Sequence, residues 1–214
     1  MAGCCDPSGY PRIFSKRYAA LLARRYRKRG LDRAARRMVG FLEREGIEGA
    51  SVLEIGGGVG NLQLELLRRG AARATNLELV EEYDAAAAEL ASEAGLVDRV
   101  ERRVVDIAAA PDAVEPADVV VLHRVVCCYP DYERLLGAAA DHARRLLVFS
   151  HPPRNVLSRS LLGVQNTFLR MTGRSFRAFA HPPEAMLAVL ARSGMEPSYR
   201  RRAPVWQVVG LERA

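Results

Sequence analysis

The stretch VLEIGGGVGN, residues 52–61, places an apolar strand, a glycine-rich turn and the start of a helix in immediate succession. Gly56, Gly58 and Gly60 allow the backbone to bend tightly and to approach a ligand that a Cβ atom would exclude. We expect Asn61 to cap the helix that follows, since asparagine is a preferred N-cap residue. The stretch therefore predicts a strand–turn–helix unit with a ligand at the turn.

Short apolar strands alternate with helical stretches from residue 51 onward, which is typical of a parallel sheet with crossover helices. The expected strands are 51–55, 74–78, 100–105, 118–122, 146–150, 197–202 and 205–211. The expected helices between them are 61–69, 80–94, 132–144 and 183–193. The last two strands are close enough to form a hairpin. This order predicts a Rossmann-like α/β fold, a seven-stranded and mostly parallel sheet with an antiparallel C-terminal hairpin.

Two further segments extend this pattern. Residues 15–45 predict two helices, in which Gly30 ends the first and Asp32 caps the second. We therefore assign residues 1–46 to an N-terminal helical segment of the same domain, which continues over residues 47–214. The long connection 151–182 predicts one or two amphipathic helices. Both a lid over the carboxyl edge of the sheet and a simple packing insertion fit it.

The charge is uneven along the chain, whose net charge is +7. Residues 1–46 carry 12 Lys and Arg residues against 4 Asp and Glu residues. A solvated arginine face explains this excess, and no exposed aromatic platform accompanies it, so nucleic acid is not the expected partner. No apolar run approaches the roughly 20 residues of a membrane span, and no secretory signal is evident. We expect a cytoplasmic protein.

The four cysteines form two adjacent pairs, Cys4-Cys5 and Cys127-Cys128. Neighbouring cysteines rarely form a disulfide with each other because the geometry is strained. Neither pair has the spacing of a zinc site, so no metal is expected. We interpret them as buried thiols.

The glycine spacing distinguishes two classes of ligand. A dinucleotide site holds pyrophosphate with the pattern G-x-G-x-x-G. Here the spacing is G-x-G-x-G, and Glu54 precedes it. A carboxylate at that point repels pyrophosphate but suits a ligand with an ammonium group. The turn therefore favours S-adenosylmethionine over NAD.

Two more acids follow at successive strand ends. Glu78 ends the second strand, where a carboxylate can accept both ribose hydroxyls. Asp106 follows the third strand, where it can accept the exocyclic amine of adenine beside an apolar neighbour. We assign the adjacent Leu79 and Ile107 to the same cofactor site.

Together, Glu54 to Gly60, Glu78 and Asp106 resemble the cofactor motifs of class I S-adenosylmethionine-dependent methyltransferases. The resemblance implies that Glu54 and the glycines contact the methionine part, Glu78 the ribose and Asp106 the adenine. Gly57 departs from the pattern, because cysteine, serine or threonine is more common there. The layout of Pro152-Pro153-Arg154, Arg174 and His181 is loosely similar to that of the magnesium-protoporphyrin O-methyltransferase group. That similarity implies a helical lid and a small-molecule acceptor.

The acceptor chemistry is expected at the ends of the fourth and fifth strands, which carry His123, Tyr129 and His151. His123 is the first candidate for a general base or an acceptor-orienting residue, with lining of the cofactor pocket as the alternative. Tyr129 and His151 are the other catalytic candidates. His142 lies in a helix and is expected to be exposed.

The N-terminal aromatic residues Tyr10, Phe14 and Tyr18 could either close over the cofactor or belong to the core.

The leading hypothesis is methyl transfer to an oxygen of a small organic acceptor. One alternative is a nucleic-acid or protein methyltransferase that docks through the basic N-terminal helices. Another is a cofactor-binding protein on the same fold that transfers no methyl group. The oligomeric state is open, and a homodimer is compatible with the sequence.

Overall fold

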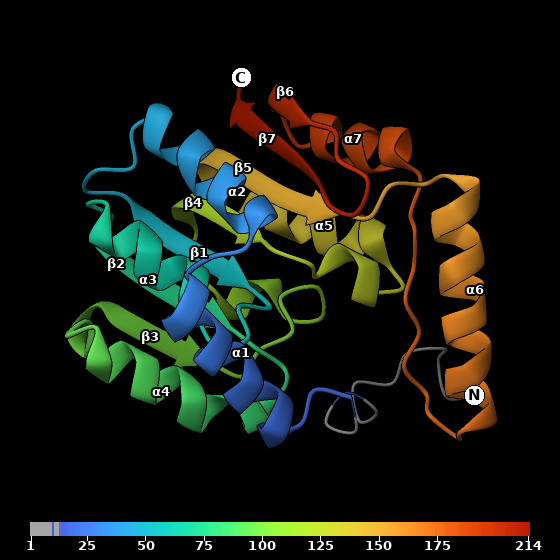
Figure 1. Ribbon diagram of the computed structural model, residues 1–214. Helices are drawn as coiled ribbons and strands as arrows, with labels where there is room; N and C mark the ends of the chain where they lie inside the picture. Colours follow the sequence, from blue (N-terminus) through green and yellow to red (C-terminus); the bar gives the residue numbers. More distant parts are fainter. Residues whose placement is uncertain (1–9, 11–12) are drawn as a thin grey trace.

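The computed structural model describes Tyr10 and residues 13–214 (Figure 1). Seven strands form one sheet in the order β3-β2-β1-β4-β5-β7-β6. The strands are β1 Ser51–Ile55, β2 Arg73–Leu77, β3 Val100–Arg103, β4 Ala117–Leu122, β5 Ala143–His151, β6 Met195–Arg201 and β7 Gln207–Arg213. The first five pair in parallel, and β7 pairs antiparallel with β5 and β6. The predicted fold class, including the C-terminal hairpin, is confirmed.

Helices cover both faces of this sheet (Figure 1). They are α1 Lys16–Arg29, α2 Arg33–Arg44, α3 Asn61–Arg68, α4 Asp84–Glu93, α5 Tyr132–Asp141, α6 Val156–Met171 and α7 Pro183–Arg192. Short 3-10 helices are η2 Glu81–Tyr83, η3 Val97–Arg99, η4 Pro111–Ala113 and η5 Val126–Cys128.

Alternate residues of the central strands point to opposite sides of the sheet. Val119 and Val121 of β4 pack into the core formed with α1 to α4, whereas Val120 and Leu122 pack into the core formed with α5 and α7. Both faces of β4 are therefore buried, as expected for a central parallel strand.

The N-terminal helices begin and end where the sequence predicts. Gly30 ends α1 in a positive-φ conformation, at φ 63°. Asp32 caps α2 by accepting the backbone N–H groups of Ala34 and Ala35. The prediction for Asn61 was wrong: Gly60 is the N-cap residue of α3, in the left-handed conformation, and Asn61 is the first helical residue. Glycine adopts this left-handed conformation readily, and the carboxylate of Glu54, rather than an N-cap side chain, accepts the N–H of Gln63 in the first turn of α3.

The connection 151–182 contains a single helix, α6, which stands apart from the sheet (Figure 1). The chain then returns beside α6, where the side chain of Asn166 exchanges two hydrogen bonds with the backbone of Ala178, at 2.8 and 2.9 Å. No helix among Tyr10 and residues 13–214 has the length and apolar content needed to cross a membrane.

His142 does not lie on the surface as expected. It is 7% exposed at the end of α5, and its ring nitrogens lie within hydrogen-bond distance of the carbonyl oxygens of Ala138, Pro111 and Val114. The error arises because two of these partners belong to the distant loop around η4.

Candidate cofactor and active site

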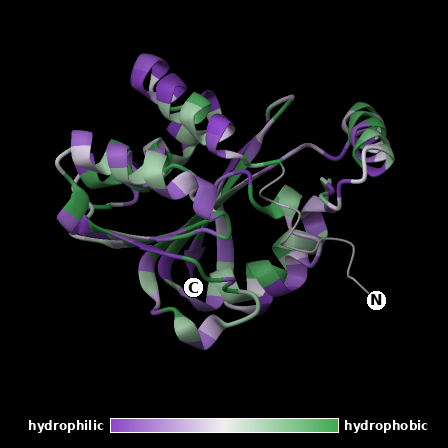
Figure 2. Ribbon diagram, turned by 90° about the horizontal axis from the view of Figure 1, so that it is seen from below, coloured by the Kyte–Doolittle hydropathy of each residue, from purple (hydrophilic) through white to green (hydrophobic). Residues whose placement is uncertain are grey.

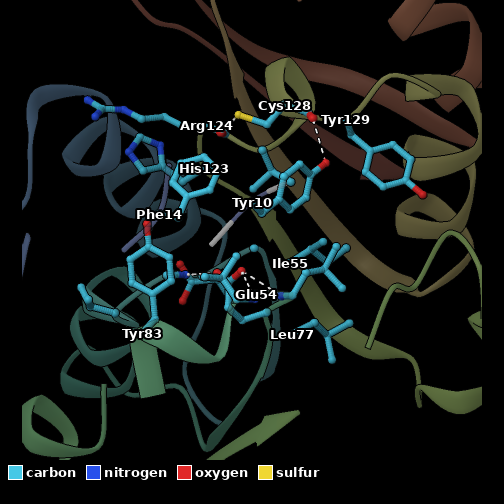
Figure 3. A pocket seen from close by; sticks show the side chains of 18 of the residues that line it. Tyr10, Phe14, Glu54, Ile55, Leu77, Tyr83, His123, Arg124, Cys128 and Tyr129 are labelled. Atoms are coloured by element: carbon cyan, nitrogen blue, oxygen red, sulfur yellow. Dashed lines mark hydrogen bonds between the residues drawn. The ribbon is translucent and has the colours of Figure 1, made fainter. Parts of the chain in front are cut away.

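A pocket of about 230 Å³ opens at the carboxyl ends of β1, β2 and β4 (Figure 3). The strand order reverses between β1 and β4, and ligands of open α/β sheets bind in the crevice outside such a switch point. The glycine turn, the loops after β2, β3 and β4, and the N-terminal segment all contribute to the lining. Residues from distant parts of the chain therefore meet here.

The glycine turn has no room for side chains at three positions. A Cβ atom on Gly56 would lie 2.5 Å from a methyl carbon of Val125, and one on Gly60 would lie 2.5 Å from the amide nitrogen of Gln63. At Gly57 it would lie 2.3 Å from Nδ2 of Asn76. Asn76 is fully buried, and its side chain occupies the space that a Cβ atom at position 57 would need. This explains why the chain has glycine where related motifs carry a small side chain.

Gly58 differs, because a Cβ atom there would meet only Tyr83, at 3.9 Å. Its φ of 55° is nevertheless in the left-handed region that favours glycine. The turn thus offers bare backbone to a ligand.

Glu54 stands near the end of β1 and is 2% exposed. One of its carboxylate oxygens accepts the backbone N–H of Gln63 at 3.2 Å. Burial raises the pKa of Glu54 to about 8, although this hydrogen bond and the positive charge of Arg102 lower it. A carboxylate with so little compensation is suited to a cationic ligand.

Glu78 follows β2 and joins it to the glycine turn. Its carboxylate accepts the N–H groups of Gly58 and Leu79, both at 2.8 Å, and that of Val80 at 3.2 Å. Burial nevertheless raises the pKa of Glu78. A carboxylate offers about four acceptor positions, so these bonds leave capacity for a ligand hydroxyl.

Asp106 follows β3 and is held from two sides. One oxygen accepts the N–H of Ala108 at 3.0 Å, and the other accepts the hydroxyl of Tyr129 at 3.0 Å. Burial and the negative charge of Asp106 raise the pKa of Tyr129. Tyr129 therefore acts in this structure as a donor that orients Asp106, and Ile107 is buried beside them in the lining.

Sequence reasoning missed Arg102 of β3, which supports the turn from behind. Its Nη1 donates to the carbonyl oxygen of Gly58 at 2.8 Å and to Oδ1 of Asn76 at 3.1 Å, while Nε donates to Asp84 at 2.6 Å. Nothing in the sequence separates Arg102 from the neighbouring Arg103.

His123 follows β4 and lines the pocket, with both ring nitrogens engaged. Nε2 lies 3.1 Å from Asp32 and Nδ1 lies 3.0 Å from the hydroxyl of Ser150. Because a carboxylate only accepts, we assign the proton to Nε2, so that Nδ1 accepts from Ser150. The Ser150 oxygen in turn accepts the backbone N–H of Arg124 at 2.9 Å.

Asp32, predicted only as a helix cap, is the second residue that sequence reasoning missed. It also pairs with the guanidinium of Arg124 at 2.9 Å. Burial alone would raise the pKa of Asp32, but the hydrogen bond with His123 and the positive charge of Arg124 are among the contacts that outweigh it and hold the pKa well below its usual range. Arg124 itself has a φ of 61°, which is unusual for a residue with a side chain and typical of functional sites.

His151 and His181 lie outside the pocket lining. His151 is 3% exposed, and its Nδ1 lies 2.9 Å from the carbonyl oxygen of Pro152. Burial lowers the pKa of His151. The Nε2 atom of His181 lies 3.0 Å from the carbonyl oxygen of Tyr129.

Tyr10, Phe14 and Tyr18 all line the pocket, and Tyr10 and Phe14 also pack into the core, whereas Tyr18 is 39% exposed. The hydroxyl of Tyr10 donates to the carbonyl oxygen of Cys128 at 3.1 Å (Figure 3). Phe14 contacts Tyr83 and Phe176, with ring centroids 6.4 and 5.4 Å apart.

Of the cysteines, Cys127 is buried and Cys128 is partly buried, with their sulfur atoms 3.6 Å apart. Cys4 and Cys5 lie outside the described residues.

Comparison with known structures identifies proteins of similar fold. A magnesium protoporphyrin IX methyltransferase from Synechocystis PCC 6803 with bound S-adenosylhomocysteine has a TM-score of 0.70 at 17% identity, covering 97% of this chain and 94% of that one. An O-methyltransferase family 2 protein from Planctomyces limnophilus, in complex with apigenin, has a TM-score of 0.68 at 20% identity, covering 93% and 62%. A geranyl diphosphate C-methyltransferase from Streptomyces coelicolor A3(2) has a TM-score of 0.65 at 14% identity, covering 83% and 79%.

Such low identities establish the fold alone. No curated protein sequence matches the chain. The profile of the methyltransferase domain family, however, matches residues 23–195. The buried acids and the bare glycine turn fit S-adenosylmethionine as the cofactor. The chain therefore belongs to the methyltransferase domain family, as a class I enzyme that depends on S-adenosylmethionine.

Proposed function

We propose that this methyltransferase transfers a methyl group to an oxygen atom of a small organic acceptor. The observation that carries the proposal is the lining of the pocket by aromatic rings. Tyr10, Phe14 and Tyr83 line the pocket, and the ring of Phe14 contacts the other two, so we infer that they narrow its mouth. A mouth of this kind admits a small molecule more readily than a folded polymer. The O-methyltransferase named above supports oxygen as the acceptor atom.

The places of the cofactor residues around the pocket support the roles that the sequence motifs predict. S-adenosylmethionine supplies a methyl group on a positively charged sulfur. Glu54 and the glycine turn, including Asn61 at its end, hold the methionine part. Glu78 with Leu79 holds the ribose, and Asp106 with Ile107 holds the adenine. The main contribution of the protein is to align the two reactants.

Among the three catalytic candidates, the geometry favours His123. His123 lies in the lining, Asp32 fixes the orientation of its ring, and its Nδ1 carries no proton and can therefore act as a proton acceptor. To accept a proton from the acceptor, its Nδ1 has to part from the hydroxyl of Ser150. Tyr129 is engaged with Asp106, and His151 lies outside the lining.

The basic N-terminal helices give less support to a nucleic-acid or protein substrate. Arg27 of α1 forms ion pairs with Glu89 and Glu93 of α4, at 3.1 and 2.7 Å. Part of the arginine excess therefore serves to attach α1 to the rest of the molecule.

The proposal is tested by incubating the protein with S-adenosylmethionine and a panel of phenols, carboxylic acids and amines, and measuring S-adenosylhomocysteine. We expect turnover with oxygen acceptors and a large loss of kcat in His123→Ala, with cofactor affinity retained. Turnover only with RNA or protein substrates would contradict the proposal. So would cofactor binding without product from any class of acceptor.

A further inference from the structure

Helix α6 exposes a stripe of large apolar side chains. Leu157, Leu161, Val164, Phe168 and Met171, which we call the α6 stripe, are 68, 62, 71, 60 and 80% exposed. Figure 2 shows α6 apart from the main body, with hydrophobic residues along it. Surface helices normally turn such residues toward the core, and a contiguous exposed patch marks an interaction site.

The α6 stripe does not belong to the face that α6 turns toward its own molecule. That face carries Leu169, which is 5% exposed, and Asn166, which bonds to the returning chain. Apart from this return segment, no other helix or strand in the described part of the chain packs extensively against α6. The helix has 16 residues, and isolated helices of this length are marginal in water. A partner on the stripe would supply the missing burial.

The spacing of the stripe identifies the kind of partner. Its residues follow one another at intervals of four, three, four and three, which is the heptad spacing of a helix–helix seam. The residues at its margins, Ser160, Gln165, Thr167 and Thr172, are uncharged. At 100° per residue, Arg159 and Arg170 fall on the opposite side of the helix. A narrow seam with neutral margins suits another helix.

Charge placement distinguishes a second copy from a membrane surface. An interfacial helix presents its basic residues beside its apolar face, where they meet anionic lipid headgroups. In α6 the arginines point away from the stripe, so they would neither reach such headgroups nor repel each other across a pair of α6 helices. The helix Val156–Met171 contains no Asp or Glu residue. A charged partner helix would therefore find no opposite charge at the seam. A second copy of α6, whose stripe is equally uncharged, fits it.

We propose that α6 pairs with α6 of a second copy of this chain, antiparallel about a twofold axis near Val164. Leu157 and Met171 both lie seven residues from Val164, so antiparallel pairing places each opposite the other across the axis. Opposed helix dipoles favour this direction over the parallel one. Complete burial of the stripe would remove at most about 600 Å² from each copy, or about 1,200 Å² in total, which is near the lower end of the range for specific interfaces.

The pairing has a consequence for the pocket. The chain that returns from α6 carries Phe176, which is 4% exposed and whose ring lies 6.0 Å from that of Tyr10 and 5.4 Å from that of Phe14. A dimer that fixes α6 therefore also restricts the movement of Phe176 and of the two rings that it contacts, Tyr10 and Phe14.

Sedimentation velocity over a series of micromolar concentrations tests the proposal. We expect the wild-type protein to be a dimer and the double variant Leu161→Glu/Phe168→Glu to be a monomer. The matched control Arg159→Glu/Arg170→Glu places two glutamates on the other side of the same helix and remains a dimer. Circular dichroism and cofactor titration check that both variants are folded.

A cross-linking experiment keeps the proposal testable if the stripe variant does not fold. Val164→Cys sits on the twofold axis, so mild oxidation should give a covalent dimer that Arg159→Cys and the wild-type protein do not give. A wild-type monomer at every concentration would overturn the proposal, as would a dimer that survives the stripe substitutions. Binding of a wild-type monomer to phosphatidylglycerol vesicles, lost in the stripe variant, would overturn it in favour of a membrane surface.

Discussion

Cofactor binding should release a proton from Glu54. Burial raises the pKa of this carboxyl group to about 8, so at neutral pH most of the ligand-free protein carries it protonated. A cationic ligand favours the carboxylate and therefore displaces the proton on binding. Below pH 8, each decrease of one pH unit should weaken the affinity for the cationic ligand by up to tenfold, or about 1.4 kcal/mol.

Isothermal titration with S-adenosylhomocysteine, in two buffers of different ionisation enthalpy, measures the released proton directly. The ammonium group of the ligand titrates near pH 8, so the series should run from about pH 6 to about pH 7.5. Glu54→Gln should bind more weakly and lose both the proton release and the pH dependence. Asp106→Asn, at the other end of the pocket, should weaken binding but keep the release.

The same shift affects stability with a definite sign. The pKa of Glu54 is about 8 in the folded protein and 4.5 ordinarily, so the folded state binds more protons between these values. The free energy of unfolding should therefore fall as the pH rises through this range. At pH 8, Glu54→Gln should be more stable than the wild type by thermal denaturation.

In the titration with S-adenosylhomocysteine, an affinity that is constant over the pH series, with no difference between the two buffers, would refute the proton release from Glu54.

Three substitutions test the supports of the site. Asp32→Asn keeps the helix cap but removes the negative charge that faces His123. The kcat should therefore fall roughly tenfold to a hundredfold, with cofactor affinity unchanged in titration. An unchanged kcat would count against a role of Asp32 in orienting His123. Gly57→Ala should lower stability by about 1–3 kcal/mol in urea denaturation, with partial recovery when Asn76→Ala is added, because the new methyl group meets that side chain. Arg102→Met should cost about 2–3 kcal/mol and weaken cofactor binding, whereas the more exposed Arg103→Met should cost little.

The order of the elements could be predicted from the sequence because periodicity and glycine positions are local properties. Their ends were less accurate. The strand expected at 146–150 begins at Ala143, and the helix expected over 132–144 ends at Asp141. The intervening residues acquire their conformation from a distant partner, since Arg213 donates to the carbonyl oxygens of Ala140 and Ala143.

The meeting of the three acids in one pocket could be predicted because the carboxyl ends of parallel strands meet at one edge of a sheet. The long-range contacts that support the rest of the site could not be predicted. His123 meets Asp32 across 91 positions of sequence, and Arg102 meets Gly58 across 44. Such pairs depend on how helices and strands pack, and a single sequence contains no local sign of them.

The most direct test of the central claim is a titration of the purified protein with S-adenosylmethionine and, separately, with NAD and NADP. The acid-lined glycine turn predicts binding of S-adenosylmethionine in the micromolar range and no binding of either nicotinamide cofactor. Binding of NAD or NADP, or the absence of binding by S-adenosylmethionine, would contradict the assignment of the pocket.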